Sequence, residues 1–142
     1  MKKVILFLTL IIGLISCNGG EATTANAAEP VKDHVEVIYF HGKQRCATCM
    51  AIEKEAKAVV EQQFANDVKN GKVQFRIVDI SDPKNEGLAN KYEVSWSSLY
   101  ITSYKNGKET RQNLTEFGFG NARSKPELFK KGLAEKIKAA LK

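Results

Sequence analysis

The stretch VEVIYFHGKQRCATC, residues 35–49, decides the fold of this chain. Its first part, residues 35–40, is rich in β-branched and aromatic side chains, which predicts a strand buried on both faces of a sheet. The polar segment 41–45 predicts a loop. Cys46 and Cys49 follow at C-x-x-C spacing, where a helical pattern of apolar residues begins. The stretch therefore predicts a pair of thiols in the first turn of a helix, directly after a buried strand.

The residues after the cysteines predict one long helix and a second strand. Apolar side chains recur at helical spacing as far as Val68, and Asn70-Gly71 is expected to end the helix. Glu53 precedes Lys57 by four residues, a spacing that supports a helix by an ion pair. Residues 73–80 alternate apolar and polar side chains, which indicates a strand.

The rest of the chain predicts a short helix, a hairpin and a final helix. Asp82-Pro83 is a helix start, with aspartate as the cap and proline in the first turn. Residues 99–104 and 109–114 are expected to be strands joined at Asn106-Gly107. Ser124-Lys125-Pro126-Glu127 predicts a capping box at the start of the last helix. The predicted order of elements is β-α-β-α-β-β-α, an α/β domain.

The N-terminus has the pattern of an export signal. Lys2 and Lys3 precede an apolar run over residues 4–15, too short to span a bilayer, which takes roughly 20 apolar residues. The run ends in Leu14-Ile15-Ser16-Cys17, which resembles the lipobox of bacterial lipoproteins. That resemblance implies a lipid on Cys17. An ordinary signal peptide with an incidental cysteine, or an uncleaved anchor, are the alternatives.

The lipobox resemblance divides the chain into three parts. Residues 1–16 are expected to be a lipoprotein signal peptide that is removed. Residues 17–33 are small and polar after the lipidated cysteine and suit a flexible tether. Residues 34–142 are expected to form the folded domain. The expected location is the bacterial cell envelope, lipid-anchored, on the periplasmic or outer face, with the membrane as a partner.

The composition points to one globular domain without a nucleic-acid partner. Of the 142 residues 43% are hydrophobic and 27% are charged, and the net charge is +6. The surplus lysines lie mainly in the C-terminal helix at the spacing of a solvated face. No aromatic residues alternate with them, as they do on surfaces that bind single-stranded nucleic acid.

The two cysteines at the helix start are candidates for redox chemistry. Unpaired backbone amides and the helix dipole favour an anion there, so Cys46 is expected to be a thiolate nucleophile. Arg45 adds a positive charge next to it, and Cys49 is expected to resolve the mixed disulfide. A purely structural disulfide is the alternative, but so short a loop removes little chain entropy. A second alternative is a soft-metal or arsenic site made by the same dithiol, with His41 as a third ligand.

Residues 35–141 resemble the thioredoxin superfamily. The resemblance rests on residues 39–49, 73–80 and 92–94, and on the strand from Leu99 with Lys105-Asn106-Gly107-Lys108-Glu109 after it. It implies a mixed four-stranded sheet flanked by helices, a redox-active disulfide and thiol-disulfide oxidoreductase activity.

Five positions depart from the thioredoxin pattern. Arg45 replaces the usual tryptophan before the first cysteine, and Ala47-Thr48 replace Gly-Pro between the cysteines. Ser98 falls where thioredoxins have a cis-proline beside the dithiol, and Tyr39 falls near the place of their buried acid. These departures favour a specialised redox protein over a general reductant of protein disulfides.

A narrower resemblance concerns the thioredoxin-like subunit of nitrophenyl-arsenical nitroreductases. It rests on Tyr39-Phe40-His41, residues 45–49, Asn113-Leu114-Thr115, Gly118-Phe119 and Ala122-Arg123-Ser124-Lys125-Pro126. The resemblance implies reduction of aromatic nitro groups together with a partner subunit.

Further residues are expected to line a site beside the dithiol. Some of these residues flank the cysteines, and the others precede elements that lie close to the cysteines in this fold. They are His41, Ala47, Thr48, Trp96, Ser97, Ser98 and Gly118. Gly118 lies in a segment, residues 117–120, expected to be a loop, and His34 is expected to be exposed. No Gly-rich dinucleotide fingerprint is present, so we expect no cofactor on this chain besides the disulfide. Electrons are then exchanged with a redox partner protein.

Overall fold

The computed structural model describes residues 33–142, so the predicted signal peptide, Cys17 and nearly all of the predicted tether lie outside the described residues. The elements follow the predicted order, with additional short helices. They are β1 (His34–His41), α1 (Ala47–Gln63), α2 (Ala65–Lys69), β2 (Val73–Asp79), the 3-10 turn η1 (Pro83–Asn85), α3 (Glu86–Lys91), β3 (Ser98–Lys105), β4 (Lys108–Asn113), α4 (Thr115–Asn121) and α5 (Pro126–Leu141).

The four strands form one mixed sheet in the order β2-β1-β3-β4. Strand β1 pairs with β2 in parallel and with β3 antiparallel, and the β3–β4 pair is antiparallel. The apolar run at residues 35–40 therefore forms a central strand, and all six of its side chains are buried. The predicted mixed four-stranded sheet flanked by helices is confirmed, and the fold is thioredoxin-like.

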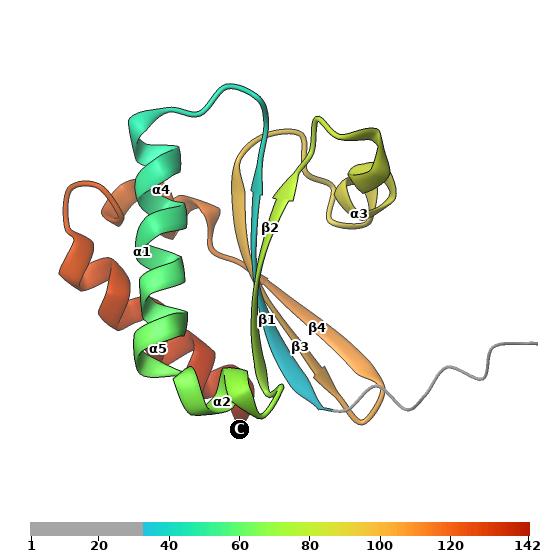
Figure 1. Ribbon diagram of the computed structural model, residues 1–142, viewed down its shortest axis with the longest axis vertical. Helices are drawn as coiled ribbons and strands as arrows, with labels where there is room; N and C mark the ends of the chain where they lie inside the picture. Colours follow the sequence, from blue (N-terminus) through green and yellow to red (C-terminus); the bar gives the residue numbers. More distant parts are fainter. Residues whose placement is uncertain (1–32) are drawn as a thin grey trace, which may run out of the picture.

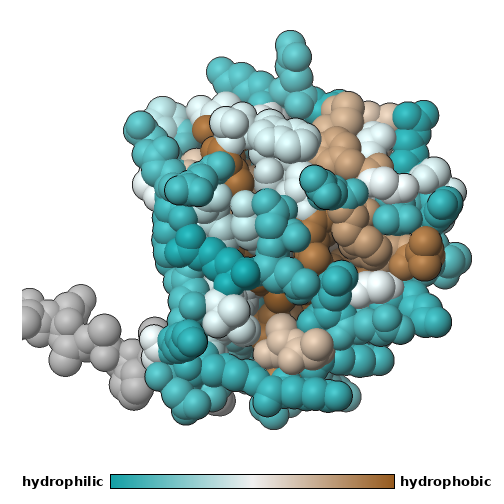
Figure 2. Space-filling view, turned by 180° about the vertical axis from the view of Figure 1, so that it is seen from behind, coloured by the Kyte–Doolittle hydropathy of each residue, from teal (hydrophilic) through white to brown (hydrophobic). Residues whose placement is uncertain are grey.

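Helices cover the two faces of the sheet unequally (Figure 1). Helices α1, α4 and α5 lie on one face, and α3 lies on the other. The larger core lies under α1 and α5, where Val37, Ile52 and Phe129 are fully or almost fully buried. From behind, hydrophobic surface gathers mainly on the side that carries α4 and α5, bordered by hydrophilic residues (Figure 2). No helix within residues 33–142 is long and apolar enough to cross a membrane.

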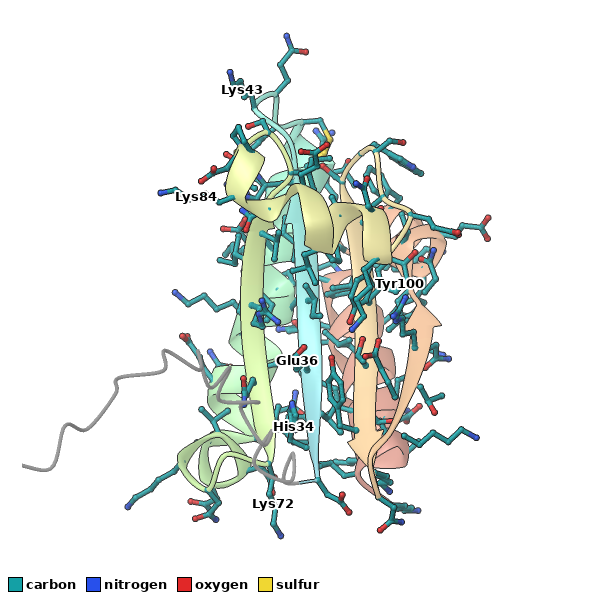
Figure 3. The ribbon with its side chains drawn as sticks, turned by 90° about the vertical axis from the view of Figure 1, so that its right-hand side faces the viewer. His34, Glu36, Lys43, Lys72, Lys84 and Tyr100 are labelled. Atoms are coloured by element: carbon teal, nitrogen blue, oxygen red, sulfur yellow. A yellow bond between two sulfur atoms is a disulfide. The ribbon has the colours of Figure 1, made fainter. Side chains whose placement is uncertain are left out.

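The dithiol and the entry of the chain lie at opposite ends of β1. The chain enters the strand at His34 and leaves it at His41, and α1 begins at Ala47. His34 lies low on the sheet in Figure 3, whereas Lys43, in the loop that leads to the cysteines, lies beyond its upper end. The cysteines therefore lie at the end of the domain that is far from His34, where β1 begins.

The predicted long helix is two helices. Helix α1 ends at Gln63, and Phe64 has a φ of −122°, outside the helical range, before α2 begins. The apolar spacing continues through the break because Phe64 is buried, with 3% of its surface exposed. Val68, which was expected to face the core, is 42% exposed. A break that buries an aromatic ring leaves the apolar period intact, so the sequence pattern does not reveal it.

The segment predicted as a loop at residues 117–120 lies in helix α4. Asn113 Oδ1 accepts a hydrogen bond from the Thr115 backbone N–H at 2.9 Å, which supports the helix start. A Cβ on Gly118 would lie 3.3 Å from Ile52 Cδ1, so the glycine allows α4 to pack closely on α1. The glycines in this segment suggested a turn, but Gly118 is a glycine in a helix because a side chain there would crowd Ile52.

The predicted capping box is also wrong. Lys125, not Ser124, is the N-cap of α5, and no side chain caps this helix. The Ser124 hydroxyl donates instead to the Gly120 carbonyl at 3.2 Å, at the end of the preceding helix. Pro126 is in the first turn, as predicted.

Candidate active site at the start of helix α1

Cys46 and Cys49 form a disulfide at the start of α1, with their Cα atoms 5.0 Å apart. Cys46 is the N-cap residue, and its extended backbone places its sulfur over the first turn of the helix. The Cys49 backbone N–H donates a hydrogen bond to Cys46 Sγ at 3.0 Å. This amide belongs to the helix N-terminus and has no carbonyl partner within the helix. It points at the sulfur of Cys46 instead, where it stabilises the negative charge that forms on reduction.

The two sulfur-bearing residues differ in exposure. Cys46 is exposed, whereas only 6% of the surface of Cys49 is exposed. A partner disulfide can reach Cys46, and Cys49 can reach little besides Cys46. This asymmetry fits the predicted roles of Cys46 as the attacking and Cys49 as the resolving thiol.

Tyr39 lies beneath the dithiol, in contact with the backbone of Cys49. Its ring is fully buried, and its hydroxyl donates to the Cys49 carbonyl oxygen at 2.8 Å. Burial raises the pKa of Tyr39, and hydrogen bonding with Ser97 and the nearby charge of Arg45 oppose this rise. The residue below the resolving cysteine is therefore a neutral hydrogen-bond donor at neutral pH.

The guanidinium of Arg45 forms an ion pair with Glu53 on α1. Arg45 Nε is buried and has no hydrogen-bond partner within the described part of the chain. The sequence predicted a different partner for Glu53, namely Lys57, which is instead 3.7 Å from Glu61. That prediction is wrong because Arg45, in the loop before the helix, reaches back along the helix face that carries the cysteines.

A cleft of about 430 Å³ adjoins the disulfide. Its most exposed apolar residue is Trp96, which is 58% exposed and whose ring centroid lies 5.4 Å from that of Phe119. Two aromatic rings thus stand beside the redox pair. The cleft is lined by Gly42, Gln44, Cys46, Cys49, Ile80, Ser95, Trp96, Ser97 and Phe119.

Five of the seven predicted lining residues do not line this cleft, namely His41, Ala47, Thr48, Ser98 and Gly118. Ser98 is buried and donates from its hydroxyl to the Trp96 carbonyl at 3.0 Å. Gly118 packs on Ile52, so its neighbour Phe119 is the residue of α4 that reaches the cleft. His41 Nδ1 lies 3.0 Å from the Gly42 carbonyl oxygen. Every peptide bond of the described segment is trans, including the one before Ser98.

Ala47 and Thr48 occupy the first turn of α1 between the cysteines. Ala47 is exposed and Thr48 is partly buried. Residues 33–142 contain no group of three or more His, Cys, Asp or Glu side chains placed to hold a metal ion. The three-ligand version of the metal alternative, with His41 beside both cysteines, is therefore not supported.

The sequence reasoning missed several residues of the site. Gly42 and Gln44 belong to the loop before the cysteines, and Ile80 directly follows β2, where parallel strands carry their sites. No sequence motif marks these three residues, and only their position in the fold places them at the site. Glu53 lies seven residues after Cys46 and four after Cys49, hence on the same helix face, a spacing that was available in the sequence.

Fold and site together give a thioredoxin-like domain with a C-x-x-C disulfide at the start of its first helix. No family model and no curated protein matches the chain. A thioredoxin from Fasciola hepatica is 22% identical, covering 75% of this chain and 81% of its own, with a TM-score of 0.46. A thioredoxin from Thermus thermophilus is 19% identical over 72% of each chain, with a TM-score of 0.44. A malarial protein is 23% identical over 73% of this chain and 97% of its own, with a TM-score of 0.43.

Proposed function

We propose that the chain is a specialised, membrane-tethered thiol-disulfide oxidoreductase that uses the Cys46–Cys49 pair. The observation that carries the proposal is the hydrogen bond from the Cys49 backbone N–H to Cys46 Sγ at 3.0 Å. It gives the exposed sulfur a donor that stabilises its thiolate, and the thiolate is the reactive form. The positive charge of Arg45, as far as Glu53 leaves it uncompensated, acts in the same direction.

The reaction moves two electrons between the dithiol and a partner disulfide. The Cys46 thiolate attacks one sulfur of the partner disulfide, a mixed disulfide forms, and the partner's other sulfur leaves as a thiolate. Cys49 then loses its proton and attacks Cys46 Sγ. The Cys46–Cys49 disulfide forms again, and the partner is released as a dithiol. The reverse sequence oxidises a partner, so direction depends on the relative reduction potentials.

Specialisation is inferred from the surface around the sulfurs. Arg45 and Ala47-Thr48 give the dithiol different neighbours from those of a thioredoxin, and Ser98 is buried with its hydroxyl bonded to the Trp96 carbonyl. The partner must therefore fit a cleft bordered by Trp96 and Phe119. An apolar or aromatic side chain beside the partner's reactive cysteine would bury the exposed indole.

We place the protein at the bacterial cell envelope, held by a lipid on Cys17. The support is the apolar run at residues 4–15 with the lipobox-like ending, together with the position of the dithiol. Because the domain begins at the end opposite the cysteines, a tether at residues 17–33 would attach far from the dithiol and leave it accessible. There it can meet a redox partner protein.

A second candidate is a redox subunit of a nitroaromatic reductase. The observation that favours it is the exposed ring of Trp96 next to the partly buried ring of Phe119 beside the disulfide, since an exposed ring can stack on a flat aromatic substrate. Reduction of a nitro group to a nitroso group takes two electrons and two protons and releases water. One oxidation of the dithiol to the disulfide supplies both electrons and both protons. A partner would then have to reduce the disulfide again.

Purified protein equilibrated with glutathione buffers tests the main proposal. We expect a reversible Cys46–Cys49 couple, and a Cys49→Ser variant that accumulates mixed disulfides with proteins of its native envelope. Cys46→Ser is the matched control and should trap almost nothing, because Cys49 is buried. A pair that never exchanges, or equal trapping by both variants, would overturn the proposal. Turnover of a nitroaromatic compound without any protein mixed disulfide would favour the second candidate.

A further inference from the structure

Glu53 stands at the centre of an interaction that neither the C-x-x-C motif nor the proposed reaction requires. It lies on α1, four residues after Cys49 and seven after Cys46, so all three share one face of the helix. Its carboxylate pairs with Arg45, the residue directly before the exposed cysteine. The side chains of Arg45 and Glu53 are 30% and 22% exposed, so the pair is only partly screened by water.

The pair is connected to the dithiol through Tyr39. The Tyr39 hydroxyl donates to the carbonyl oxygen of Cys49 at 2.8 Å, and Arg45 and Glu53 both act electrostatically on that hydroxyl, with opposite signs. Ser97, from the segment before β3, hydrogen-bonds the same hydroxyl. The charged and titratable groups of this cluster are thus Tyr39 from β1, Arg45 from the loop and Glu53 from α1.

The position of Arg45 carries a cost that the ion pair offsets. Its Nε is buried without a hydrogen-bond partner in the described region, and a buried polar atom without a partner destabilises the fold. A guanidinium whose only function was to attract a thiolate could extend into solvent beside the exposed Cys46 and avoid this cost. The carboxylate of Glu53 explains why it lies inward.

We propose that Glu53 is a positioning residue that sets the reduction potential of the dithiol by holding and neutralising Arg45. The disulfide is uncharged, whereas the reduced pair carries a negative charge on Cys46. A free Arg45 would stabilise this charge and make the couple more oxidising, because stabilising the reduced form raises the potential. Glu53 cancels most of that effect. This inference rests on the proposed redox function and identifies the group that tunes it.

The proposal predicts opposite shifts for the two partners. In Glu53→Gln the charge of Arg45 is uncompensated, so the Cys46 thiolate should be stabilised about tenfold and the potential raised by about 30 mV for a two-electron couple. In Arg45→Met the carboxylate of Glu53 is uncompensated, so the Cys46 thiolate should be destabilised and the potential lowered. The double variant Arg45→Met/Glu53→Gln should return close to the wild type, with a coupling that the double-mutant cycle measures.

The chain offers a matched control on the same helix. Glu61 forms an exposed ion pair with Lys57 at 3.7 Å, remote from the cysteines, so Glu61→Gln removes the same charge and should change neither quantity. The measurements are the thiolate absorbance of Cys46 against pH and the equilibrium with glutathione buffers, after circular dichroism has shown folding. Glu53→Asp keeps the charge and serves as the rescue variant if Glu53→Gln does not fold.

The outcomes separate this inference from the proposed function. Opposite shifts in the single variants, with wild-type values in Glu61→Gln, support it. Shifts of the same sign in Glu53→Gln and Arg45→Met would mean that the pair only maintains the fold, and would overturn it. An unchanged Cys46 thiolate titration and an unchanged potential in Glu53→Gln, with a wild-type couple that still exchanges, would also overturn it. A wild-type dithiol that does not exchange at all would overturn the proposed function itself.

Discussion

The two faces of the central strand β1 are both buried, but they are stabilised by different interactions. Val35, Val37 and Tyr39 point into the core under the helices α1 and α5. On the other face only Ile38 and Phe40 enter an apolar cluster, which α3 covers. Below α3 the same face carries Glu36, which is 7% exposed, and no helix of residues 33–142 covers it (Figure 3).

The uncovered half is held together by polar contacts. Both carboxylate oxygens of Glu36 lie 3.3 Å from Arg76 Nη1, and His34 Nε2 lies 3.8 Å from one of them. The His34 ring stacks on Tyr104 with centroids 4.5 Å apart. The prediction that His34 is exposed is wrong, since its side chain is 13% exposed. The difference between the faces teaches that one strand can be buried by helices on one side and by its own sheet neighbours on the other.

The largest expected effect is on the helix-covered face. Phe129 in α5 is fully buried and stacks on Phe117 with centroids 5.5 Å apart. Phe129→Ala should lower the free energy of unfolding by about 3–5 kcal/mol, because it leaves a cavity in the main core. Urea denaturation measures this. The neighbouring Leu128, which is 52% exposed, provides the control: Leu128→Ala should change stability by less than about 0.5 kcal/mol. Equal losses in both variants would contradict the asymmetry of α5.

An intermediate effect is expected on the uncovered face. Arg76→Ala leaves the carboxylate of Glu36, whose side chain is 9% exposed, without its main partner. The free energy of unfolding should fall by about 1–3 kcal/mol, the cost of a buried group that loses its hydrogen bond. Replacing both groups, as in Glu36→Leu/Arg76→Met, should recover most of this loss, since it removes the buried charge as well. Strictly additive single effects in urea denaturation would show that the pair is not coupled.

The sequence predicted the framework of the fold because periodicity and turn residues reflect burial and backbone geometry. The β1 stretch, the hairpin at Asn106-Gly107 and the start at Asp82-Pro83 all depend on local rules, and all are confirmed. The break at Phe64 and helix α4 depend on packing between distant segments. A buried aromatic ring and a glycine packed on Ile52 have no local signature that distinguishes them from a continuous helix or a turn.

The sequence likewise predicted the local part of the candidate site and missed the part that depends on tertiary contacts. The C-x-x-C spacing predicted the pair and its place at the helix start, because this chemistry needs two thiols one turn apart. The ion pair between Arg45 and Glu53 was not predicted, since the i, i+4 rule favoured Lys57 as the partner of Glu53. A loop residue that folds back on its own helix competes with that rule, and only the tertiary structure shows which partner wins.

The smallest expected effect compares one tyrosine from each face of the sheet. Burial raises the pKa of Tyr39 on the helix-covered face, and burial followed by the nearby Glu36 raises the pKa of Tyr104 on the uncovered face. An unfolded tyrosine ionises near pH 10, so these raised values contribute stability that is complete below about pH 10 and is lost as the pH rises further. Tyr39→Phe and Tyr104→Phe should each make the alkaline loss of stability shallower in urea denaturation.

The two tyrosine variants should differ in one respect that the faces explain. Tyr39 donates to the Cys49 carbonyl at 2.8 Å, whereas Tyr104 stacks on His34 at the opposite end of β1. Tyr39→Phe should therefore also shift the equilibrium of the dithiol with glutathione, and Tyr104→Phe should leave it unchanged. A shift of equal size in both variants would mean that the two faces communicate through the sheet. An alkaline stability profile identical to the wild type in both would mean that neither hydroxyl is buried as the structure places it.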